Sequence, residues 1–165
     1  MTGCCPEVLA LRLLKLFLVL VVAAATPARA GLFEDASVAH AKGDYATALR
    51  LLGSLAEQGN ASAQNDLGEM YGNGEGVAQD YSTAATWYQK AADQGEVSAQ
   101  FHLGLMYGRG QGVPKSLAEA HKWFDVAAAQ SNADAIKSRD LAASKMTPVQ
   151  IAEAYFWAWM RAYLP

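Results

Sequence analysis

Residues 67–77 read LGEMYGNGEGV, and 36 residues later 103–113 read LGLMYGRGQGV. The similarity extends beyond these segments, because 61–96 and 97–132 share 16 identities in 36 aligned positions. An earlier partial copy, 43–64, keeps 10 of 22 residues when it is aligned with 79–100. A fixed period of this size is typical of stacked repeat arrays, in which each unit packs on its neighbours. Such arrays form binding surfaces more often than active sites.

Each copy is predicted to contain two helices joined by a short turn, since apolar residues recur at helical spacing and no segment alternates as a strand would. Asp44, Asp80 and Ser116 are placed to cap the second helices, and residues 147–150 (Thr-Pro-Val-Gln) resemble a capping box. Helices are expected at 32–41, 44–58, 62–71 and 80–94, twice within 97–130, at 133–144 and at 148–163. The fold class is therefore predicted to be all-α, an α/α solenoid whose four helix pairs form a right-handed superhelix.

Two glycines inside predicted helices indicate close helix contacts. Gly68 and Gly104 occupy the same repeat position, although glycine in a helix costs about 1 kcal/mol relative to alanine. We expect a neighbouring helix to lie against each missing side chain, with Ala84 and Ala120 as the counterparts.

Residues 1–30 have the three parts of a secretory signal peptide. Arg12 and Lys15 supply positive charge, 16–25 are all apolar, and 28–30 (Ala-Arg-Ala) form a small-x-small cleavage site. Ten helical residues reach only about half of a bilayer core of roughly 30 Å. We therefore expect cleavage before Gly31 and a periplasmic or secreted protein without stable membrane insertion. A retained membrane anchor is the alternative.

The remaining segment, 31–165, has the size of one domain and is mildly acidic. It carries ten Lys/Arg and fifteen Asp/Glu, and it has no cysteine because both cysteines precede the apolar run. Nucleic-acid binding is not expected, since phosphate contacts need clustered basic residues. A disulfide and a thiol nucleophile are excluded for this segment.

The repeated residues resemble the Sel-one-like repeat family, which is related to the tetratricopeptide repeats. The family pattern is an alanine, Leu-Gly-x-x-Tyr, a Gly-x-Gly-Val loop, an acidic residue, an alanine, Trp-Tyr, Ala-Ala and Gly. The first copy has it at Ala63, Leu67, Gly68, Tyr71, Gly74, Gly76, Val77, Asp80, Ala84, Trp87, Tyr88, Ala91, Ala92 and Gly95. The second has Ala99, Leu103, Gly104, Tyr107, Gly110, Gly112, Val113, Ala120, Trp123, Phe124, Ala127 and Ala128, and departs at Ser116 and Ser131.

This resemblance implies repeats at about 32–60, 61–96 and 97–132, followed by C-terminal capping helices at 133–165. It also implies a solenoid that mediates protein–protein contacts. Exported bacterial members of the family are often adaptors or regulators in the cell envelope. We therefore expect a non-enzymatic scaffold that binds a protein or peptide, with a hydrolase acting on peptidoglycan or a β-lactam as the alternative.

No catalytic or metal-binding constellation stands out in the sequence. The three histidines, His40, His102 and His121, are widely spaced and have no ligand-type motif around them. The segment 72–76 (Gly-x-Gly-x-Gly) follows a predicted helix rather than a strand, so a structural turn is favoured over a phosphate loop. No cofactor, metal or catalytic residue is expected.

The last predicted helix is rich in aromatic residues. Its face toward the repeats is expected to contain Ile151, Ala154, Tyr155, Ala158 and Ala162, and a second apolar face to contain Phe156, Trp157, Met160 and Tyr163. A helix that only caps the array needs one apolar face. A surface for a partner or for self-association on the second face is therefore the alternative to simple capping.

The binding surface is predicted on the concave side, which the first helix of each pair lines in tetratricopeptide-like arrays. Positions two before, two after and six after the motif leucine should point into this groove, while the leucine and tyrosine face the core. The partner-binding residues are therefore predicted to be Asn65, Glu69, Asn73, Phe101, Leu105 and Arg109. We expect Phe101 and Leu105 to anchor an apolar segment and Arg109 to bind an acidic group.

Overall fold

The computed structural model describes residues 31–163, apart from the side chains of 157–159 and 161–163. The described chain forms eight helices and contains no strand, so the all-α prediction is confirmed. The helices span 31–41, Tyr45–Glu57 (α2), Ala61–Asn73 (α3), Tyr81–Asp93 (α4), Val97–Arg109 (α5), Leu117–Ala128 (α6), Ala133–Ser144 (α7) and Pro148–Tyr163 (α8). The predicted signal peptide and its cleavage site, 1–30, lie outside the described residues.

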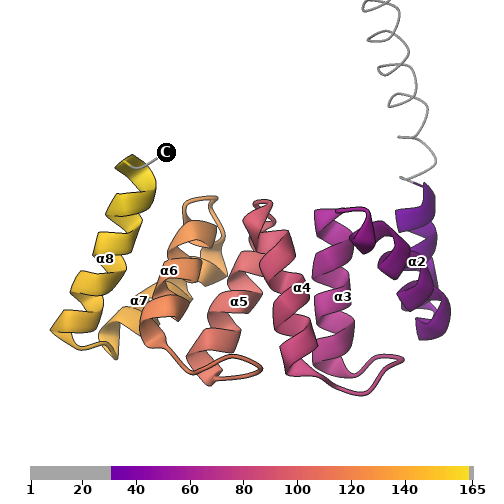
Figure 1. Ribbon diagram of the computed structural model, residues 1–165, viewed down its shortest axis with the longest axis horizontal. Helices are drawn as coiled ribbons and strands as arrows, with labels where there is room; N and C mark the ends of the chain where they lie inside the picture. Colours follow the sequence, from indigo (N-terminus) through magenta and orange to yellow (C-terminus); the bar gives the residue numbers. More distant parts are fainter. Residues whose placement is uncertain (1–30, 164–165) are drawn as a thin grey trace, which may run out of the picture.

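Consecutive helices run antiparallel in a row along the long axis of the molecule (Figure 1). Within each repeat the first helix packs on the second, α3 on α4 and α5 on α6. Between repeats the second helix packs on the first helix of the next unit, as α4 does on α5 and α6 on α7. The predicted solenoid of stacked helix pairs is therefore confirmed.

Side chains cap most of the helices at the predicted turns. Asp44 accepts a hydrogen bond from Thr47 N, Asp80 accepts from Ser82 N and Thr83 N, and Ser116 accepts from Glu119 N. Two further caps occupy the same repeat position: Asn60 begins α3 and Asn132 begins α7. These bonds satisfy backbone N–H groups that have no partner inside a helix.

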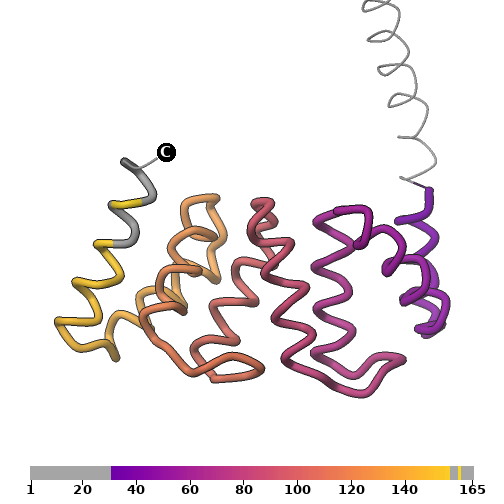
Figure 2. Tube along the Cα trace, in the orientation of Figure 1, coloured from indigo at the N-terminus to yellow at the C-terminus, as the bar shows by residue number. Residues whose placement is uncertain are grey.

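The glycine-containing loops after α3 and α5 lie on one edge of the stack (Figure 2). Each loop rests on the start of the second helix of the preceding repeat: a Cβ on Gly76 would lie 2.6 Å from Tyr45 Cβ, and one on Gly112 would collide with the Tyr81 carbonyl. Both glycines also have positive φ, a conformation that favours glycine. The loops are therefore packing elements between repeats.

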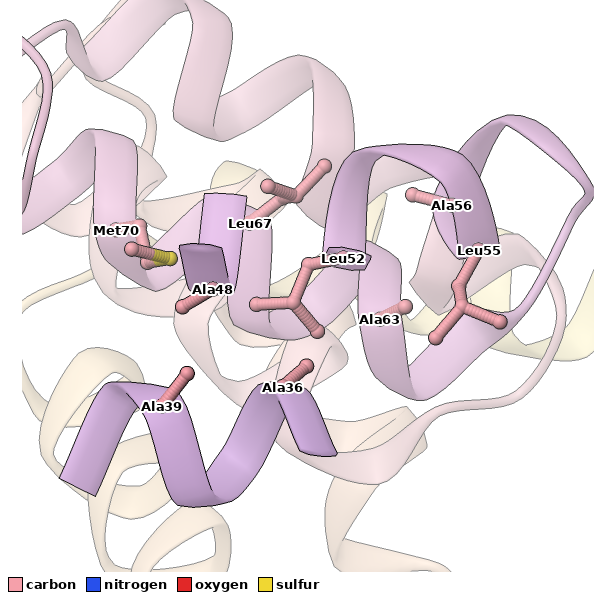
Figure 3. Packing of buried hydrophobic residues seen from close by; sticks show 9 residues of the cluster. All are labelled: Ala36, Ala39, Ala48, Leu52, Leu55, Ala56, Ala63, Leu67 and Met70. Atoms are coloured by element: carbon pink, nitrogen blue, oxygen red, sulfur yellow. The ribbon is translucent and has the colours of Figure 1, made fainter. Parts of the chain in front are cut away.

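The core is built mainly from alanine and a few large side chains. Figure 3 shows its N-terminal cluster, in which Leu52, Leu55 and Met70 fill the space among small residues of the first three helices. Two further clusters follow along the chain, one around Tyr88 and Leu103 and one around Phe124 and Ala142. Each cluster joins neighbouring repeats, as expected for units that cannot bury their apolar faces alone.

The glycine contacts were predicted with the wrong partner. A Cβ on Gly68 would lie 2.7 Å from the Tyr88 ring, and one on Gly104 would lie close against the Phe124 ring. Ala84 and Ala120 instead face Gly72 and Gly108, at 3.8 and 3.7 Å from their ideal Cβ positions. The aromatic rings occupy the space beside Gly68 and Gly104, so neither position can accept a side chain.

The C-terminal helices depart from the repeat plan. The capping box is confirmed, since Thr147 N donates to Gln150 Oε1 at 2.9 Å and Gln150 N to Thr147 Oγ1 at 3.3 Å. However, the main contacts of α8 are with α6 rather than with α7, so these two helices do not form a fourth pair like the others. Ala154 is buried as expected, and the Tyr155 ring lies edge-on to that of His121 on α6 with centroids 6.1 Å apart, although the side chain is 64% exposed.

Candidate interaction groove

Three clefts occupy successive positions along one side of the solenoid. The first lies between the helix 31–41, α2 and α3, the second between α3, α4 and α5, and the third between α5, α6 and α7. Their volumes are about 190, 210 and 280 Å³. We call the three together the groove.

The second and third clefts are the same site translated by one repeat. Shifting their lining by 36 residues pairs Gly72 with Gly108, Asn73 with Arg109, Tyr81 with Leu117, Ala84 with Ala120, Tyr88 with Phe124, His102 with Ser138, Leu105 with Leu141, Met106 with Ala142 and Arg109 with Lys145. Small residues are kept at the floor, and two lining pairs keep their character, Leu105 with Leu141 and Arg109 with Lys145. The other clear replacements change polarity or charge: Asn73, Tyr81 and His102 give way to Arg109, Leu117 and Ser138. The scaffold is thus constant while part of the lining varies.

The first cleft is acidic. Asp66 and Glu69 line it from α3, facing His40 on the first helix. Burial raises the pKa of the Asp66 carboxyl, which outweighs the opposing effect of the hydrogen bond from Asn65. The contact with His102, 3.4 Å from Nε2 to Oε1, lowers the pKa of Glu69.

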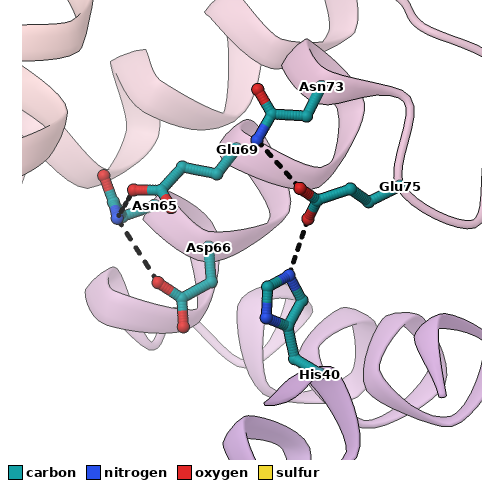
Figure 4. A network of polar contacts seen from close by, with 6 residues as sticks. All are labelled: His40, Asn65, Asp66, Glu69, Asn73 and Glu75. Carbon is teal, nitrogen blue, oxygen red and sulfur yellow. Dashed lines mark hydrogen bonds and ion pairs between the residues drawn. The ribbon is translucent and has the colours of Figure 1, made fainter. Parts of the chain in front are cut away.

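Hydrogen bonds hold these carboxylates against neighbouring side chains in two groups (Figure 4). The amide nitrogen of Asn65 donates to Glu69 Oε1 at 3.0 Å and to Asp66 Oδ1 at 3.3 Å. Glu75, in the loop after α3, accepts from His40 Nε2 at 2.6 Å and from Asn73 Nδ2 at 3.1 Å. The carboxylates are therefore held in place by neighbouring side chains.

The second cleft contains an aromatic stack between two repeats. The rings of Tyr88 on α4 and His102 on α5 lie parallel, with centroids 4.9 Å apart. Burial, together with the negative charges of Glu69 and Asp66, raises the pKa of the Tyr88 hydroxyl, which stays neutral. One wall of the second cleft is therefore formed by the uncharged phenol ring of Tyr88 stacked on the imidazole of His102.

Buried glutamines fix the helices that line the groove. Gln64 and Gln100 are only 4% and 3% exposed, and their amide nitrogens donate to the Ala56 and Ala92 carbonyls at the end of the preceding helix. Their side-chain oxygens accept from Gln94 and Gln130. Each glutamine thereby connects the first helix of a repeat to the second helices on both sides of it.

The six predicted binding residues have different positions. Glu69 lines the first cleft, Asn73 the second, and Leu105 and Arg109 both the second and the third. Asn65 is 6% exposed and lies within the polar network rather than at a cleft surface. Phe101 is half-buried against the Phe124 cluster, with ring centroids 5.7 Å apart, so packing accounts for it.

Sequence reasoning missed several lining residues, notably Asp66, His102, Leu141 and Lys145. Two of them could have been found, because Leu141 and Lys145 lie one period after Leu105 and Arg109. The weak similarity of 133–144 to the earlier copies concealed them. Asp66 and His102 share one repeat position, one residue before the motif leucine, which was assigned to neither the core nor the groove.

Within residues 31–163 the structure brings together no three His, Cys, Asp or Glu side chains in an arrangement that holds a metal ion. Among the described helices, none is both long and apolar enough to span a membrane.

Comparison with known proteins identifies the repeat. The model of the Sel1 repeat matches residues 37–60, 61–96 and 97–132, which together make up more than half of the chain. The chain therefore belongs to the Sel1 repeat family. Repeats of this family generally mediate protein–protein interaction, and their proteins are typically non-enzymatic scaffolds. No curated protein sequence matches the chain.

Solved structures of the same family are similar over most of the chain. The protective antigen c5321 of uropathogenic Escherichia coli, which displays an SLR fold, is 27% identical with a TM-score of 0.74, covering 83% of this chain and 33% of its own. A Sel1 repeat protein from Oxalobacter formigenes is 37% identical with a TM-score of 0.63, covering 65% and 44%. Cysteine rich protein B of Helicobacter pylori is 29% identical with a TM-score of 0.53, covering 55% and 68%. The chain thus spans less than half of the first two relatives.

Proposed function

We propose that this chain is a non-enzymatic adaptor or regulator of the bacterial cell envelope that holds a segment of a partner protein in the groove. The observation that carries the proposal is the equivalence of the second and third clefts, in which the glycine and alanine floor stays while Asn73 and His102 are replaced by Arg109 and Ser138. The shared floor keeps the two clefts equivalent, and a lining that differs between them lets each cleft contact a different part of one bound segment.

Site-specific photocrosslinking tests whether the partner binds on the side of the solenoid that carries the groove. A photoreactive phenylalanine analogue replaces Asn73, which is exposed in the second cleft, or Thr86, which is exposed on the opposite side of α4. In cells that express the full chain, we expect one protein to crosslink from Asn73 and not from Thr86. A partner captured equally from both positions, or only from Thr86, contradicts the proposal.

The envelope location rests on residues 1–30, whose charge, apolar run and Ala-Arg-Ala site fit a cleaved signal peptide. The mass of the intact protein from a periplasmic fraction should equal that of residues 31–165. A membrane-bound species that retains residues 1–30 would show an anchor instead.

The hydrolase alternative is tested with the same preparation. Incubated with peptidoglycan and with a β-lactam, the purified protein should leave both substrates intact. Turnover that a point substitution in the groove abolishes would overturn the scaffold proposal.

A further inference from the structure

The third cleft differs from the other two in being apolar. Phe124 and Leu117 on α6 face Leu105 on α5 and Leu141 on α7 across a floor of small residues, including Gly108 and Ala120. Leu141 is 58% exposed, whereas Leu105 at the same position of the preceding repeat is half-buried. The volume of about 280 Å³ exceeds the ~150 Å³ of an apolar cavity that accepts benzene, so a large side chain fits.

Two cations border this apolar cleft. Arg109, at the end of α5, and Lys145, which ends α7, both line it, and both are exposed. Neither forms an ion pair or a hydrogen bond through its side chain with any residue in the described part of the chain. A cation at a helix C-terminus is favourable by itself, but this effect does not require two cations from different helices to border the same cleft.

Charge also changes sign along the solenoid. Residues 31–104 contain ten Asp/Glu and three Lys/Arg, whereas 105–165 contain five and seven. Where the third cleft presents Ser138 and Leu141, the first presents Asp66 and Glu69 at the equivalent positions of α3. An acidic residue of a bound segment is therefore repelled from the first cleft and attracted to the third, which fixes the position of that segment in the groove.

From these observations we propose that the third cleft binds a large apolar side chain of a partner segment, and that Arg109 and Lys145 bind an acidic residue next to it. The proposal rests on the proposed function, because it names the chemistry of the segment that the groove holds. The apolar contact supplies affinity, and the paired charges supply selectivity for the acidic neighbour.

Synthetic peptides of one length, blocked at both ends, are the probe. Each contains one phenylalanine in a Gly/Ser background, flanked by glutamate, by glutamine or by lysine. Binding to the purified full chain is followed by isothermal titration. We expect the glutamate peptide to bind about tenfold more tightly than the glutamine peptide, and the lysine peptide to bind least.

Charge reversal provides the matched comparison. The double variant Arg109→Glu with Lys145→Glu should lose the preference for glutamate and gain one for lysine. The control Lys115→Glu with Lys137→Glu changes the net charge equally in the same half of the chain, at exposed lysines that do not line the cleft, and should behave as wild type. Melting curves establish that all variants are folded.

Equal affinity for the glutamate and glutamine peptides, or no binding of either, overturns the inference. So does an unchanged preference in the Arg109/Lys145 variant. Failure of this inference is distinguishable from failure of the proposed function by crosslinking in the Arg109→Glu, Lys145→Glu variant. If the partner still crosslinks from Asn73, the groove binds its partner and only the chemistry inferred for the bound segment is wrong.

Discussion

Gln94 donates a hydrogen bond of 2.7 Å to the buried side-chain oxygen of Gln64, 30 residues earlier in the chain. The same bond recurs one period later, where Gln130 donates to Gln100 at 2.9 Å. The side chains of Gln64 and Gln100 are almost completely buried, and each also donates a hydrogen bond to a backbone carbonyl of the preceding repeat. The array is therefore connected by a polar ladder as well as by apolar packing. The ladder stops at α7, where Ile136 occupies the glutamine position.

Gln100→Leu should lower the free energy of unfolding by roughly 1–3 kcal/mol, because it removes two hydrogen bonds of about 0.5–1.5 kcal/mol each. Gln130→Ala removes only the exposed partner and should cost roughly half as much. Denaturant unfolding of both single variants and of the double variant gives their coupling energy. Strictly additive effects would mean that the ladder contributes nothing beyond its separate side chains.

Gly104→Ala should destabilise the protein, although alanine is the better helix former by about 1 kcal/mol. The added Cβ would collide with the buried Phe124 ring, so overpacking of roughly 1–3 kcal/mol is expected to exceed the gain. Gly53→Ala is the matched control, since Gly53 lies inside α2 with nothing within 4 Å of its ideal Cβ position. It should raise the denaturation midpoint. The same sign for both variants would refute the helix contact.

Asp66→Asn should stabilise the protein at neutral pH. Burial raises the folded-state pKa of Asp66 above its ordinary value of 3.8, so the stabilising contribution of the protonated form is present below that value and lost as pH rises through the folded-state pKa. Asparagine does not ionise and avoids this loss. The advantage in melting temperature should therefore be full at pH 7 and disappear near pH 3.

Asp80→Asn is the control, because it should change stability at neutral pH in the direction opposite to Asp66→Asn. The hydrogen bonds from Thr83 lower the pKa of Asp80, so the ionised form stabilises the folded state above the ordinary value of 3.8 and this contribution is lost as pH falls below it. This variant should be less stable than wild type at pH 7. Parallel pH profiles for the two variants would contradict both assignments.

Ser131→Gly should stabilise the protein by roughly 0.5–1 kcal/mol. Ser131 has a φ of 66°, a left-handed conformation that is unfavourable for residues with a side chain, and the preceding repeat has Gly95 with a φ of 91° at this position. The reciprocal change, Gly95→Ser, should cost a similar amount. Thermal unfolding of the two variants is the measurement, and shifts in the same direction would exclude backbone strain as the cause.

The sequence predicts the local features of this fold well. The helix caps at Asp44, Asp80 and Ser116 and the capping box at Thr147 were assigned correctly because they depend on residues within one turn. The period of 36 residues gave the stacking of successive units. These signals lie in short segments and need no knowledge of distant contacts.

The features that were missed depend on contacts between distant residues. Nothing near Gly68 indicates that a ring at Tyr88 fills its space, and nothing within 148–163 shows that this helix packs on α6. Phe101 is predicted for the binding surface from its place two residues before the motif leucine, and in the structure its side chain also packs on Phe124. The place of a residue within the repeat indicates which side of the helix it occupies, and does not distinguish a ligand contact from a local core contact.

The translation of one cleft onto the next by 36 residues has a consequence for how such proteins diversify. Because the glycine and alanine floor is separate from the residues that give each cleft its charge, duplicating one repeat would lengthen the groove by one cleft and leave the others undisturbed. Selection can then change a lining residue of a cleft without repacking the scaffold. A chimaera that exchanges 61–96 for a second copy of 97–132 should therefore carry Leu117 and Phe124 in two successive clefts, the first of which would still take His102 from α5.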